Sequence, residues 1–523
     1  MKAILLIAAA FAVPARAQEF IVRLFWLNPP KEARVVSKGV AVRVRPSARL
    51  LRRFSPPSRL EVPGVAPLNL RVPLEVRARA GRLLMTVRMK REDYVAGVLA
   101  GEAANFRSEE ALKAMTVVLR TYAVRNQRRH AAEGFQLCDT THCQDMRLGA
   151  VTDRLRAAAE ETEGELLWYG GRPARTFHSQ HCGGTTESAR DVWPDEDAPY
   201  LRSREDTFCV AQNRFEWQAR VAAADLSQAL GSAEMRVLER NESGRVARIA
   251  AGGRVLAPES LRQALGWDKV RSAFFEVRND SDAVVFRGHG SGHGVGLCQI
   301  GALRRGEAGH DHRAILDFYY PGTVLGVGAA GFAWTRLGGE RVDVLTTRET
   351  TDQPIAALGD RLLAEAEQQT GASIPFRPRI KVYATIAEFR DATGEPGWVA
   401  ASTRGETVRL QPSTALRARG ALETTLRHEL LHLAVEREAH ARTPLWFREG
   451  LVLWLAGAEP AQAAVRDGTA PDRALISPRS EAGMRSAYAS AHGRVRALGV
   501  RYGKQQLLRW LREGLPQSRA GRP

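Results

Sequence analysis

The segment TLRHELLHLAVE, residues 425–436, places His428, Glu429 and His432 in an apolar, helix-forming stretch. Residues four positions apart lie on one face of a helix, so both imidazoles can reach one divalent cation. Glu429 lies beside the first histidine and can activate a water molecule there. The spacing therefore predicts a zinc site, and the alternative is a helix that carries two histidines without a metal.

A zinc site of this kind needs a third protein ligand. Glu436 shares the helical face, but it lies about 12 Å along the axis from His428, too far to bind the same ion. Glu449 in TPLWFREGLVLWLAG is the better candidate, because its carboxylate interrupts an apolar surface and needs a partner. Thr443 is expected to cap that helix, which would start at Pro444. We predict Glu449 as the third zinc ligand.

A second carboxylate with catalytic potential is Glu102. It continues an apolar stripe formed by Val95, Val98 and Leu99 on one helical face, so packing through that stripe would partly desolvate it. Desolvation raises the pKa of a carboxyl group, as a general acid working near neutral pH requires. The alternative is an ordinary glutamate at a helix end that faces solvent.

The five cysteines all fall between residues 138 and 298, and His142 and His181 lie next to three of them. In an exported protein, two disulfides with one cysteine left over would account for this set. A structural zinc ion is the other interpretation, although the spacing is not that of a standard zinc finger. Its four ligands would be Cys138, His142, Cys143 and Cys182.

The start of the chain has the features of an export signal. Lys2 precedes an apolar run over residues 3–13, and the small-residue pattern at 15–17 predicts cleavage after Ala17. An uncleaved anchor is the alternative. No later stretch has the roughly 20 apolar residues of a membrane-spanning helix, so no transmembrane span is expected after cleavage. For an exported chain with a formal charge of +18, the anionic cell envelope is a better-suited partner than nucleic acid. The alternative is that the basic residues only form a solvated surface.

A chain of 523 residues exceeds one hydrophobic core, so we expect an α+β protein of two modules. Alternating apolar segments predict strands over 20–89, and a three-to-four period predicts helices over 92–130, with Ser108 as an N-cap. Strands and Gly-rich loops follow to residue 332. The resulting prediction is a signal peptide (1–17), a β-rich mixed module with a central helical region (18–330), a strand-helix module (331–512) and a disordered tail (513–523).

Four blocks of the first module, residues 91–123, 176–193, 288–307 and 315–323, resemble in order the sporulation stage II protein D / LytB amidase-enhancer family. The resemblance covers roughly residues 35–325. It implies a lytic transglycosylase that cuts peptidoglycan glycan strands, with Glu102 as acid and then base. Sporulation itself does not follow from it. By the same resemblance, the residues of the substrate cleft would be His178, Ser179, Gly183, Gly184, His293 and Gln299.

The second module resembles the peptidase MA-like group of gluzincin metallopeptidases over roughly residues 335–515, through HELLH and PLWFREGL. The resemblance implies a zincin-like fold, zinc bound by His428, His432 and Glu449, and Glu429 as general base in peptide hydrolysis. Residues 397–412 would form the edge strand along which a peptide substrate lies. Tyr488 could stabilise an oxyanion, although a core tyrosine fits that position better.

These resemblances predict an exported protein of the periplasm or cell envelope that acts on peptidoglycan. Two alternatives remain open. The first module could be a non-catalytic glycan-binding platform that activates a separate amidase. Alternatively, the zinc peptidase could be the sole enzyme, targeted to the wall by the first module and acting on a peptide substrate.

Overall fold

The chain forms two compact units, one before and one after residues 332–333. Helices and strands occur in both, so the predicted mixture of α and β structure is confirmed, whereas the zincin-like class of the second unit stays a prediction. The predicted signal peptide and residues 517–523 of the predicted tail lie outside the described residues. The computed structural model describes residues 19–47, 50–196, 198–211, 213–329, 331, 334–457, 475 and 481–516.

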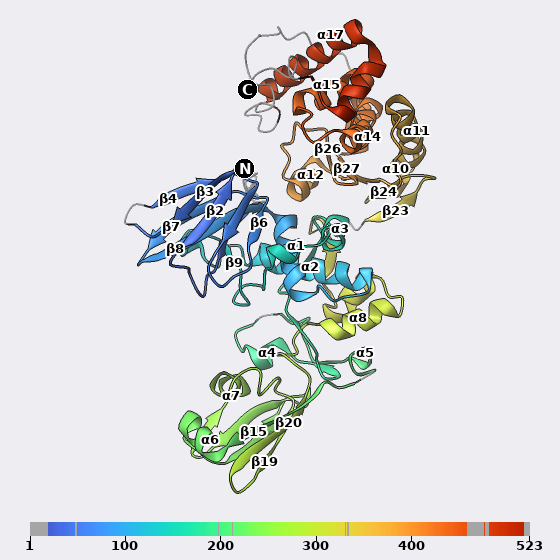
Figure 1. Cartoon of the computed structure of the whole chain (residues 1–523). Helices are drawn as coiled ribbons and strands as arrows, with labels where there is room; N and C mark the ends of the chain where they lie inside the picture. The colour runs from blue at the N-terminus through green and yellow to red at the C-terminus, as the bar shows by residue number, and fades with distance from the viewer. Residues whose placement is uncertain are drawn as a thin grey trace, which may run out of the picture. The chain divides into compact units, whose positions relative to one another are not determined.

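Residues 19–90 form strands because their apolar side chains alternate. Every second residue of β8 (Arg82–Lys90) is buried, and β1 (Glu19–Leu24) pairs with it antiparallel. One sheet has the order β4-β7-β8-β1-β9 and the other β3-β2-β5-β6 (Figure 1). The remaining strands are β2 (Ala33–Ser37), β3 (Val40–Val44), β4 (Leu51–Phe54), β5 (Ser58–Glu61), β6 (Leu68–Leu70), β7 (Leu74–Arg79) and β9 (Leu137–Cys138).

The predicted helical region contains two helices, α1 (Arg91–Glu102) and α2 (Glu109–Arg125). Ser108 caps α2 as predicted, because its hydroxyl accepts a hydrogen bond from the Ala111 N–H. The fully buried Arg120 of α2 donates to the Glu92 carboxylate of α1, with an Nη2–Oε2 distance of 2.5 Å. This ion pair fixes the orientation of α1 and therefore of Glu102 at its end.

Among the described residues, the rest of the first unit consists of short helices and five small sheets of two or three strands. The sheet β15-β20-β19 and the sheet β16-β17-β18 share a separate apolar core with α6 and α7. The elements are α3 (Asp153–Glu161), β10 (Leu166–Tyr169), β11 (Arg172–Pro173), β12 (His178–Ser179), β13 (Thr185–Thr186), α4 (Ala189–Val192), β14 (Arg204–Glu205), α5 (Thr207–Val210), β15 (Glu216–Ala222), α6 (Ala223–Leu230), β16 (Met235–Arg240), β17 (Val246–Ala251), β18 (Arg254–Leu256), α7 (Pro258–Leu265), β19 (Phe275–Asn279), β20 (Ala283–His289), β21 (Leu297–Cys298), α8 (Gln299–Glu307), α9 (His312–Tyr319) and β22 (Val324–Gly326).

The second unit is built on a five-stranded mixed sheet with the order β23-β24-β25-β27-β26. All four residues of β27 are buried, as expected for an inner strand. The outermost strand β26 pairs antiparallel with β27. The strands are β23 (Thr335–Gly338), β24 (Asp343–Thr346), β25 (Arg379–Val382), β26 (Ala401–Arg404) and β27 (Thr407–Leu410).

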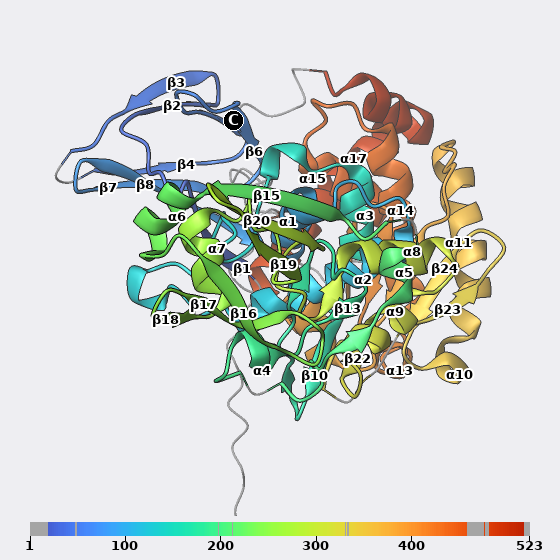
Figure 2. The same ribbon diagram turned by 90° about the horizontal axis from the view of Figure 1, so that it is seen from below.

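Helices α14 (Leu422–Glu438), α15 (Leu445–Leu455) and α17 (Glu481–Glu513) pack together in this unit (Figure 2). Gly503, at φ 77°, interrupts α17. The prediction that Thr443 caps α15 was wrong. Pro444 is the capping residue, and the Thr443 hydroxyl instead donates to the Leu511 carbonyl. The other helices are α10 (Glu349–Asp352), α11 (Pro354–Thr370), α12 (Ile386–Thr393) and α13 (Ser413–Ala418).

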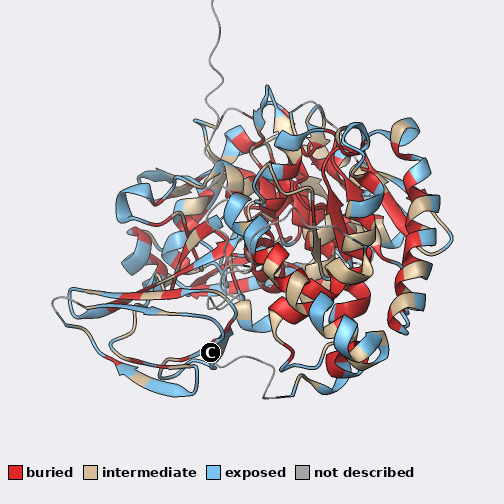
Figure 3. Ribbon diagram, turned by 90° about the horizontal axis from the view of Figure 1, so that it is seen from above, coloured by how far each residue is buried: buried red, intermediate tan, exposed pale blue. Residues whose placement is uncertain are grey.

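Among the described residues, buried apolar side chains form three cores, two in the first unit and one in the second. Figure 3 shows these buried positions in red along both helices and strands. None of the helices in the described ranges combines the length and apolar character needed to span a bilayer.

Candidate catalytic and metal sites

Glu102 lies at the C-terminal end of α1, where three separate segments meet its carboxylate and backbone. Its Oε2 is 3.2 Å from Nε2 of His178 on β12. Its Oε1 accepts a hydrogen bond of 3.2 Å from the backbone N–H of Asp145. The side chain retains 18% exposure, so a substrate can still reach the carboxylate.

The pKa of Glu102 is lower than that of an ordinary glutamate, contrary to the expectation of a raised value. Burial raises this pKa, but the hydrogen bond and positive charge of His178 outweigh burial, and the Asp145 N–H and Arg147 add to the lowering. The sequence expectation considered only the apolar stripe of α1. The partner that reverses the shift comes from a strand 76 residues further along the chain.

Gln299 positions Glu102 from the other side. Its side-chain Nε2 donates to the main-chain carbonyl of Glu102 over 3.1 Å. Gln299 begins α8, directly after β21, and β21 pairs in parallel with the β12 strand that carries His178 and Ser179. The two sequence blocks HSQHCGG and GLCQIG are therefore brought together at Glu102, with Gln299 as a positioning residue.

The glycines of GHGSGHGVG pack against protein rather than leaving room for a sugar. A Cβ at Gly296 would lie 2.2 Å from the Phe177 carbonyl oxygen, and one at Gly292 would lie 2.8 Å from Cβ of Ser179. Gly290 and Gly292 also have positive φ angles. Close packing against the β12 segment therefore accounts for the glycines at positions 292 and 296.

The remaining predicted cleft residues lie around the same segment. The pKa of His293 is lowered to about 3 by burial, with nearby positive charge adding to the effect, and its Nδ1 accepts from the Val295 N–H. The Ser179 hydroxyl is buried and has no hydrogen-bond partner among the described residues. Gly183 and Gly184 both have positive φ angles, and a Cβ at Gly183 would lie 2.8 Å from the His289 ring. Their side chains and turns shape the segment beside Glu102.

The cysteines form two groups, and all five are free thiols. The proposed ligand set that included Cys182 was wrong, because Cys182 lies with Cys209, Cys298 and Asp206 instead. The fourth member of the other group is a residue that sequence reasoning missed. That group consists of His130, Cys138, His142 and Cys143, whose donor atoms lie within 4.8 Å of one another.

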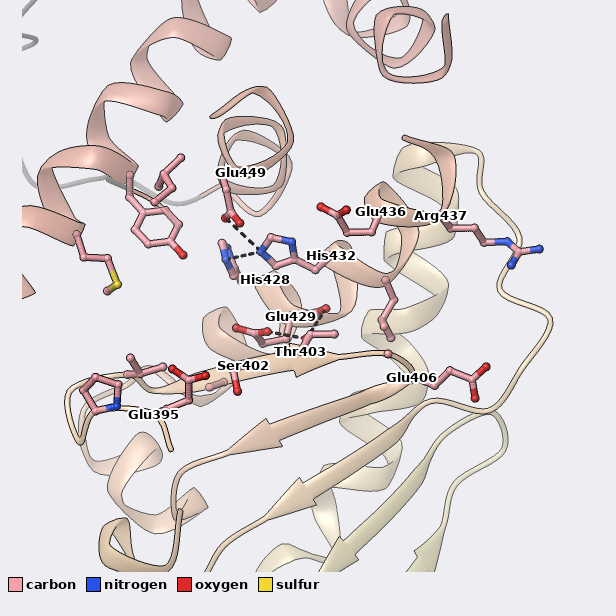
Figure 4. Close-up of a pocket in the computed structure, with 18 of the residues that line it drawn as sticks. Glu395, Ser402, Thr403, Glu406, His428, Glu429, His432, Glu436, Arg437 and Glu449 are labelled. Atoms are coloured by element: carbon pink, nitrogen blue, oxygen red, sulfur yellow. Dashed lines mark hydrogen bonds and ion pairs between the residues drawn. The ribbon is translucent and has the colours of Figure 1, made fainter. Parts of the chain in front are cut away.

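The second unit brings together all three predicted zinc ligands. Nε2 of His432 on α14 is 3.1 Å from Nε2 of His428 and 3.3 Å from Oε2 of Glu449 on α15 (Figure 4). Two ligand nitrogens about 2.0–2.1 Å from a tetrahedral zinc ion are themselves about 3.3 Å apart, so these separations suit one ion. Glu436 forms an ion pair with Arg448, consistent with its exclusion as a ligand.

The three groups titrate differently because all are buried and each faces a different neighbouring charge. Burial, reinforced by His432, lowers the pKa of His428 to about 3. Burial by itself lowers the pKa of His432. The negative charge and hydrogen bond of Glu449 have the larger, opposite effect and raise the His432 pKa to about 9. Burial raises the pKa of Glu449, and the two histidines lower it further than burial raises it. His428 is therefore neutral near pH 7 and can bind a cation directly, whereas His432 must first lose a proton.

Glu429 points away from the histidine pair toward β26 (Figure 4). The Thr403 hydroxyl of that strand donates to its Oε2 over 2.6 Å. Burial raises the Glu429 pKa, while His432 and the Thr403 hydrogen bond reduce that rise. A buried carboxylate with a raised pKa is suited to accept a proton from water. Thr403 was not predicted individually, although it lies in the expected edge strand.

A cavity of about 810 Å³ opens beside these residues, and both Thr403 and Tyr488 line it. The Tyr488 ring centroid is 6.3 Å from that of His428. β26 ends the sheet at this cavity, so its outer edge faces the space where an extended peptide could pair. Of the predicted edge strand over residues 397–412, only β26 lies at the edge, because β27 is an inner strand. β26 and Tyr488 both line the cavity.

Several proteins are similar to this chain. Residues 79–169 match the family model described as stage II sporulation protein, and residues 205–296 match a domain of unknown function, DUF8618. An uncharacterized protein of Brachyspira hyodysenteriae is 31% identical over 241 residues, which are 44% of this chain and 65% of that protein. Stage II sporulation protein D of Bacillus subtilis is 29% identical over 260 residues, 45% of this chain and 74% of that protein.

The amidase enhancer of Bacillus subtilis is 27% identical over 286 residues, which are 44% of this chain but 40% of that protein. The chain thus spans just under two thirds of the Brachyspira protein and less than half of the amidase enhancer. The matched family segment holds α1, α2 and Glu102. Residues 79–169 of the first unit are therefore similar to the stage II sporulation protein family.

Proposed function

We propose that the first unit cleaves peptidoglycan glycan strands as a lytic transglycosylase, with Glu102 as the acid and base. The observation that carries this proposal is the partly exposed Glu102 carboxylate, held by His178 and the Asp145 N–H at the end of α1. The similarity of this chain to stage II sporulation protein D and to the amidase enhancer supports peptidoglycan as the substrate class. Export to the periplasm or cell envelope is part of the same proposal.

The reaction needs one carboxyl group. Protonated Glu102 gives its proton to the glycosidic oxygen as the bond from that oxygen to C1 of the muramic acid breaks. The C6 hydroxyl oxygen of the same sugar then bonds to C1, and its proton returns to Glu102. The products are a 1,6-anhydromuramic end and a free hydroxyl on the leaving sugar. No water is consumed, so a second catalytic carboxylate is unnecessary.

Stem-peptide-free glycan strands test this activity directly. The full chain should produce 1,6-anhydromuramic ends by mass spectrometry, and Glu102→Gln should not. Glu109→Gln is a matched control, because Glu109 is exposed at the start of the next helix and pairs with Arg154. If the full chain binds the strands without cutting them, the first unit is a glycan-binding platform of the amidase-activating kind.

We propose as a second activity that the second unit is a zinc-dependent peptidase. The facing nitrogens of His428 and His432 and the nearby Glu449 oxygen fit zinc, because their separations match those of donor atoms around one tetrahedral ion. When bound, zinc would supply a Lewis acid beside the cavity. Glu429 would take the proton of the attacking water and pass it to the leaving amine, with its carboxylate oriented by Thr403.

A peptide library and isolated stem-peptide cross-links test the second activity. Glu429→Gln should abolish cleavage while the bound zinc is retained, and His432→Ala should lose both. Glu423→Gln is the control on the same helix, because Glu423 lies in the first turn and pairs with Arg361 and Arg427. Cleavage that survives Glu429→Gln would contradict the proposal. Peptidoglycan combines glycans with peptides, so both activities could act on one polymer.

We also propose a structural zinc ion at His130, Cys138, His142 and Cys143, in place of the set that included Cys182. Nε2 of His130 is 3.4 Å from Sγ of Cys143, and Nδ1 of His142 is 3.8 Å from Sγ of Cys138. Two thiolates and two imidazoles are a common structural zinc set. Cys138→Ser should release one zinc ion per chain, measured by elemental analysis.

A further inference from the structure

A second group of three cysteines lies next to the strand pair that carries His178 and Gln299. Sγ of Cys209 on α5 is 3.4 Å from Sγ of Cys298, and Sγ of Cys182 is 3.7 Å from Oδ2 of Asp206. The four donor atoms lie within 4.8 Å of one another, and all four residues are buried. Three parts of the chain converge at this cysteine group. They are the segment 178–184, α5 with the loop before it, and the start of α8.

The separations suit a tetrahedral metal ion. Sulfur atoms about 2.3 Å from one zinc ion are about 3.8 Å apart, whereas sulfurs of a disulfide are about 2.05 Å apart. Three thiols also cannot all be paired as disulfides within the group. Three soft sulfur donors and one carboxylate oxygen favour zinc over calcium or magnesium.

The surroundings are arranged for negative charge on the sulfurs. The backbone N–H groups of Cys182 and Gly301 both donate to Sγ of Cys298, at 3.2 and 3.4 Å. Cys298 is also the N-cap of α8, and the start of a helix stabilises a thiolate. Sγ of Cys298 thus faces two N–H groups, an arrangement that suits a sulfur bound to a metal ion.

A fully buried arginine gives independent support. Arg245 donates to the main-chain carbonyls of Thr185 and Cys182, at 2.8 and 2.6 Å, and its Nε has no hydrogen-bond partner among the described residues. A buried guanidinium that donates to neutral carbonyls needs nearby negative charge. The buried Glu187 carboxylate supplies part of that charge, and three thiolates and Asp206 around one divalent ion, with a net charge of −2, would add to it.

Asp206 is held for a ligand role by its own neighbours. Its Oδ1 accepts from Arg305 over 3.0 Å, and its Oδ2 accepts from the Tyr319 hydroxyl over 2.6 Å. Gly301 leaves the necessary space, since a Cβ there would lie 2.2 Å from Oδ2. Hydrogen bonds that orient a ligating carboxylate are typical of the shell around metal ligands.

We propose that Cys182, Cys209, Cys298 and Asp206 bind a structural zinc ion. The ion would tie α5 and the start of α8 to the segment after β12. Because Cys298 precedes Gln299 and pairs with Ser179 in the β12–β21 ladder, the ion would also fix the residues around Glu102. The site is distinct from the other cysteine group and independent of whether either proposed enzyme activity exists.

Cobalt substitution of the full chain separates the three metal sites. Cobalt bound by thiolates gives a charge-transfer band in the near ultraviolet, which the histidine-glutamate site cannot produce because it has no sulfur ligand. In a Cys138→Ser/Cys143→Ser chain loaded with Co²⁺, the band should persist, because the three cysteines that remain are those of the proposed site. In Cys182→Ser, the band should fall to the share of the two-thiolate group, with loss of one metal equivalent per chain.

Two results would overturn the proposal. One is a Cys138→Ser/Cys143→Ser chain that binds cobalt without a thiolate band. The other is a disulfide among Cys182, Cys209 and Cys298 in the isolated chain, seen as linked peptides in non-reducing mass analysis. The Cys138→Ser/Cys143→Ser measurement leaves the proposed ligands intact, so it remains decisive even where Cys182→Ser does not fold. Circular dichroism of both variants identifies that case.

Discussion

Nε2 of His178 lies 3.2 Å from Oε2 of Glu102, and this pair controls the protonation of the proposed catalytic acid. The Glu102 pKa is lowered because His178 stabilises the carboxylate more than burial destabilises it. The acid is active when protonated, so activity should be greatest below the Glu102 pKa and decline as pH rises through it.

His178→Gln should therefore raise the Glu102 pKa and move the alkaline limb of the activity profile to higher pH. Glutamine keeps a hydrogen-bond donor but removes the positive charge. The measurement is the pH dependence of anhydromuramic product formation in the wild type and the variant. If the variant changes the maximal activity but leaves the pH of the alkaline limb unchanged, His178 contacts the substrate without changing the pKa of Glu102.

Gly101→Ala tests the position of Glu102 without removing any catalytic group. A Cβ at Gly101 would lie 2.1 Å from the Asp145 carbonyl oxygen, so the segment whose N–H binds Glu102 must move. A shift of about 1 Å can lower a rate roughly hundredfold. Gly149→Ala is the control, because its Cβ would meet Leu68 at 3.4 Å, an ordinary contact. Equal glycan cleavage by both variants would show that this loop does not position Glu102.

Arg120→Met should strongly destabilise the first unit, because it leaves the buried Glu92 carboxylate without its main partner. Removing one partner of a buried ion pair lowers the free energy of unfolding by about 3–5 kcal/mol. The double variant Glu92→Leu/Arg120→Met should recover much of this loss, since both charges of this pair are then removed together. Urea unfolding midpoints measure both effects, and Arg34→Met at the exposed pair with Glu61 should change little. A double variant as unstable as the single one would assign the cost to lost packing.

Local patterns predicted the parts of the sites that lie within one helix. His428 and His432 are four residues apart on α14, and helical geometry alone brings them together. Glu449 could be predicted because a lone carboxylate in an apolar helix needs a partner. Ser108 was correctly identified as an N-cap for the same kind of reason, since a cap acts on the residues that follow it.

Contacts between distant segments could not be predicted in this way. Cys209 and Cys298 meet across 89 residues, so no spacing pattern connects them, and Cys182 was grouped with its neighbours in sequence. His130 lies only eight residues before Cys138, but the intervening turn gives no regular period that would reveal it. The direction of the Glu102 pKa was missed for the same reason, because His178 reaches it from another strand.

Thr403→Val should move the acid limb of peptide cleavage to higher pH. The Thr403 hydroxyl stabilises the Glu429 carboxylate and limits the rise in its pKa that burial causes. Glu429 acts as a base when ionised, so activity is present above its pKa and is lost as pH falls through it. Removing the hydroxyl raises that pKa further. The pH dependence of kcat/KM on a cleaved library peptide measures the shift, and an unchanged acid limb would assign Thr403 to the sheet edge alone.

Zinc should stabilise the second unit through Glu449. A ligand that binds only the folded state at a hundred times its Kd adds about 2.7 kcal/mol, and each kcal/mol raises Tm by roughly 2–4 °C in a unit of this size. A chelator should therefore lower the Tm of this unit in the wild type, and Glu449→Gln should show a smaller chelator effect. Glu436→Gln is the control, since Glu436 pairs with Arg448 outside the ligand set. Calorimetry measures the change in Tm. If the chelator lowers Tm equally in the wild type and in Glu449→Gln, Glu449 is not the third ligand, and the two histidines of α14 have another partner.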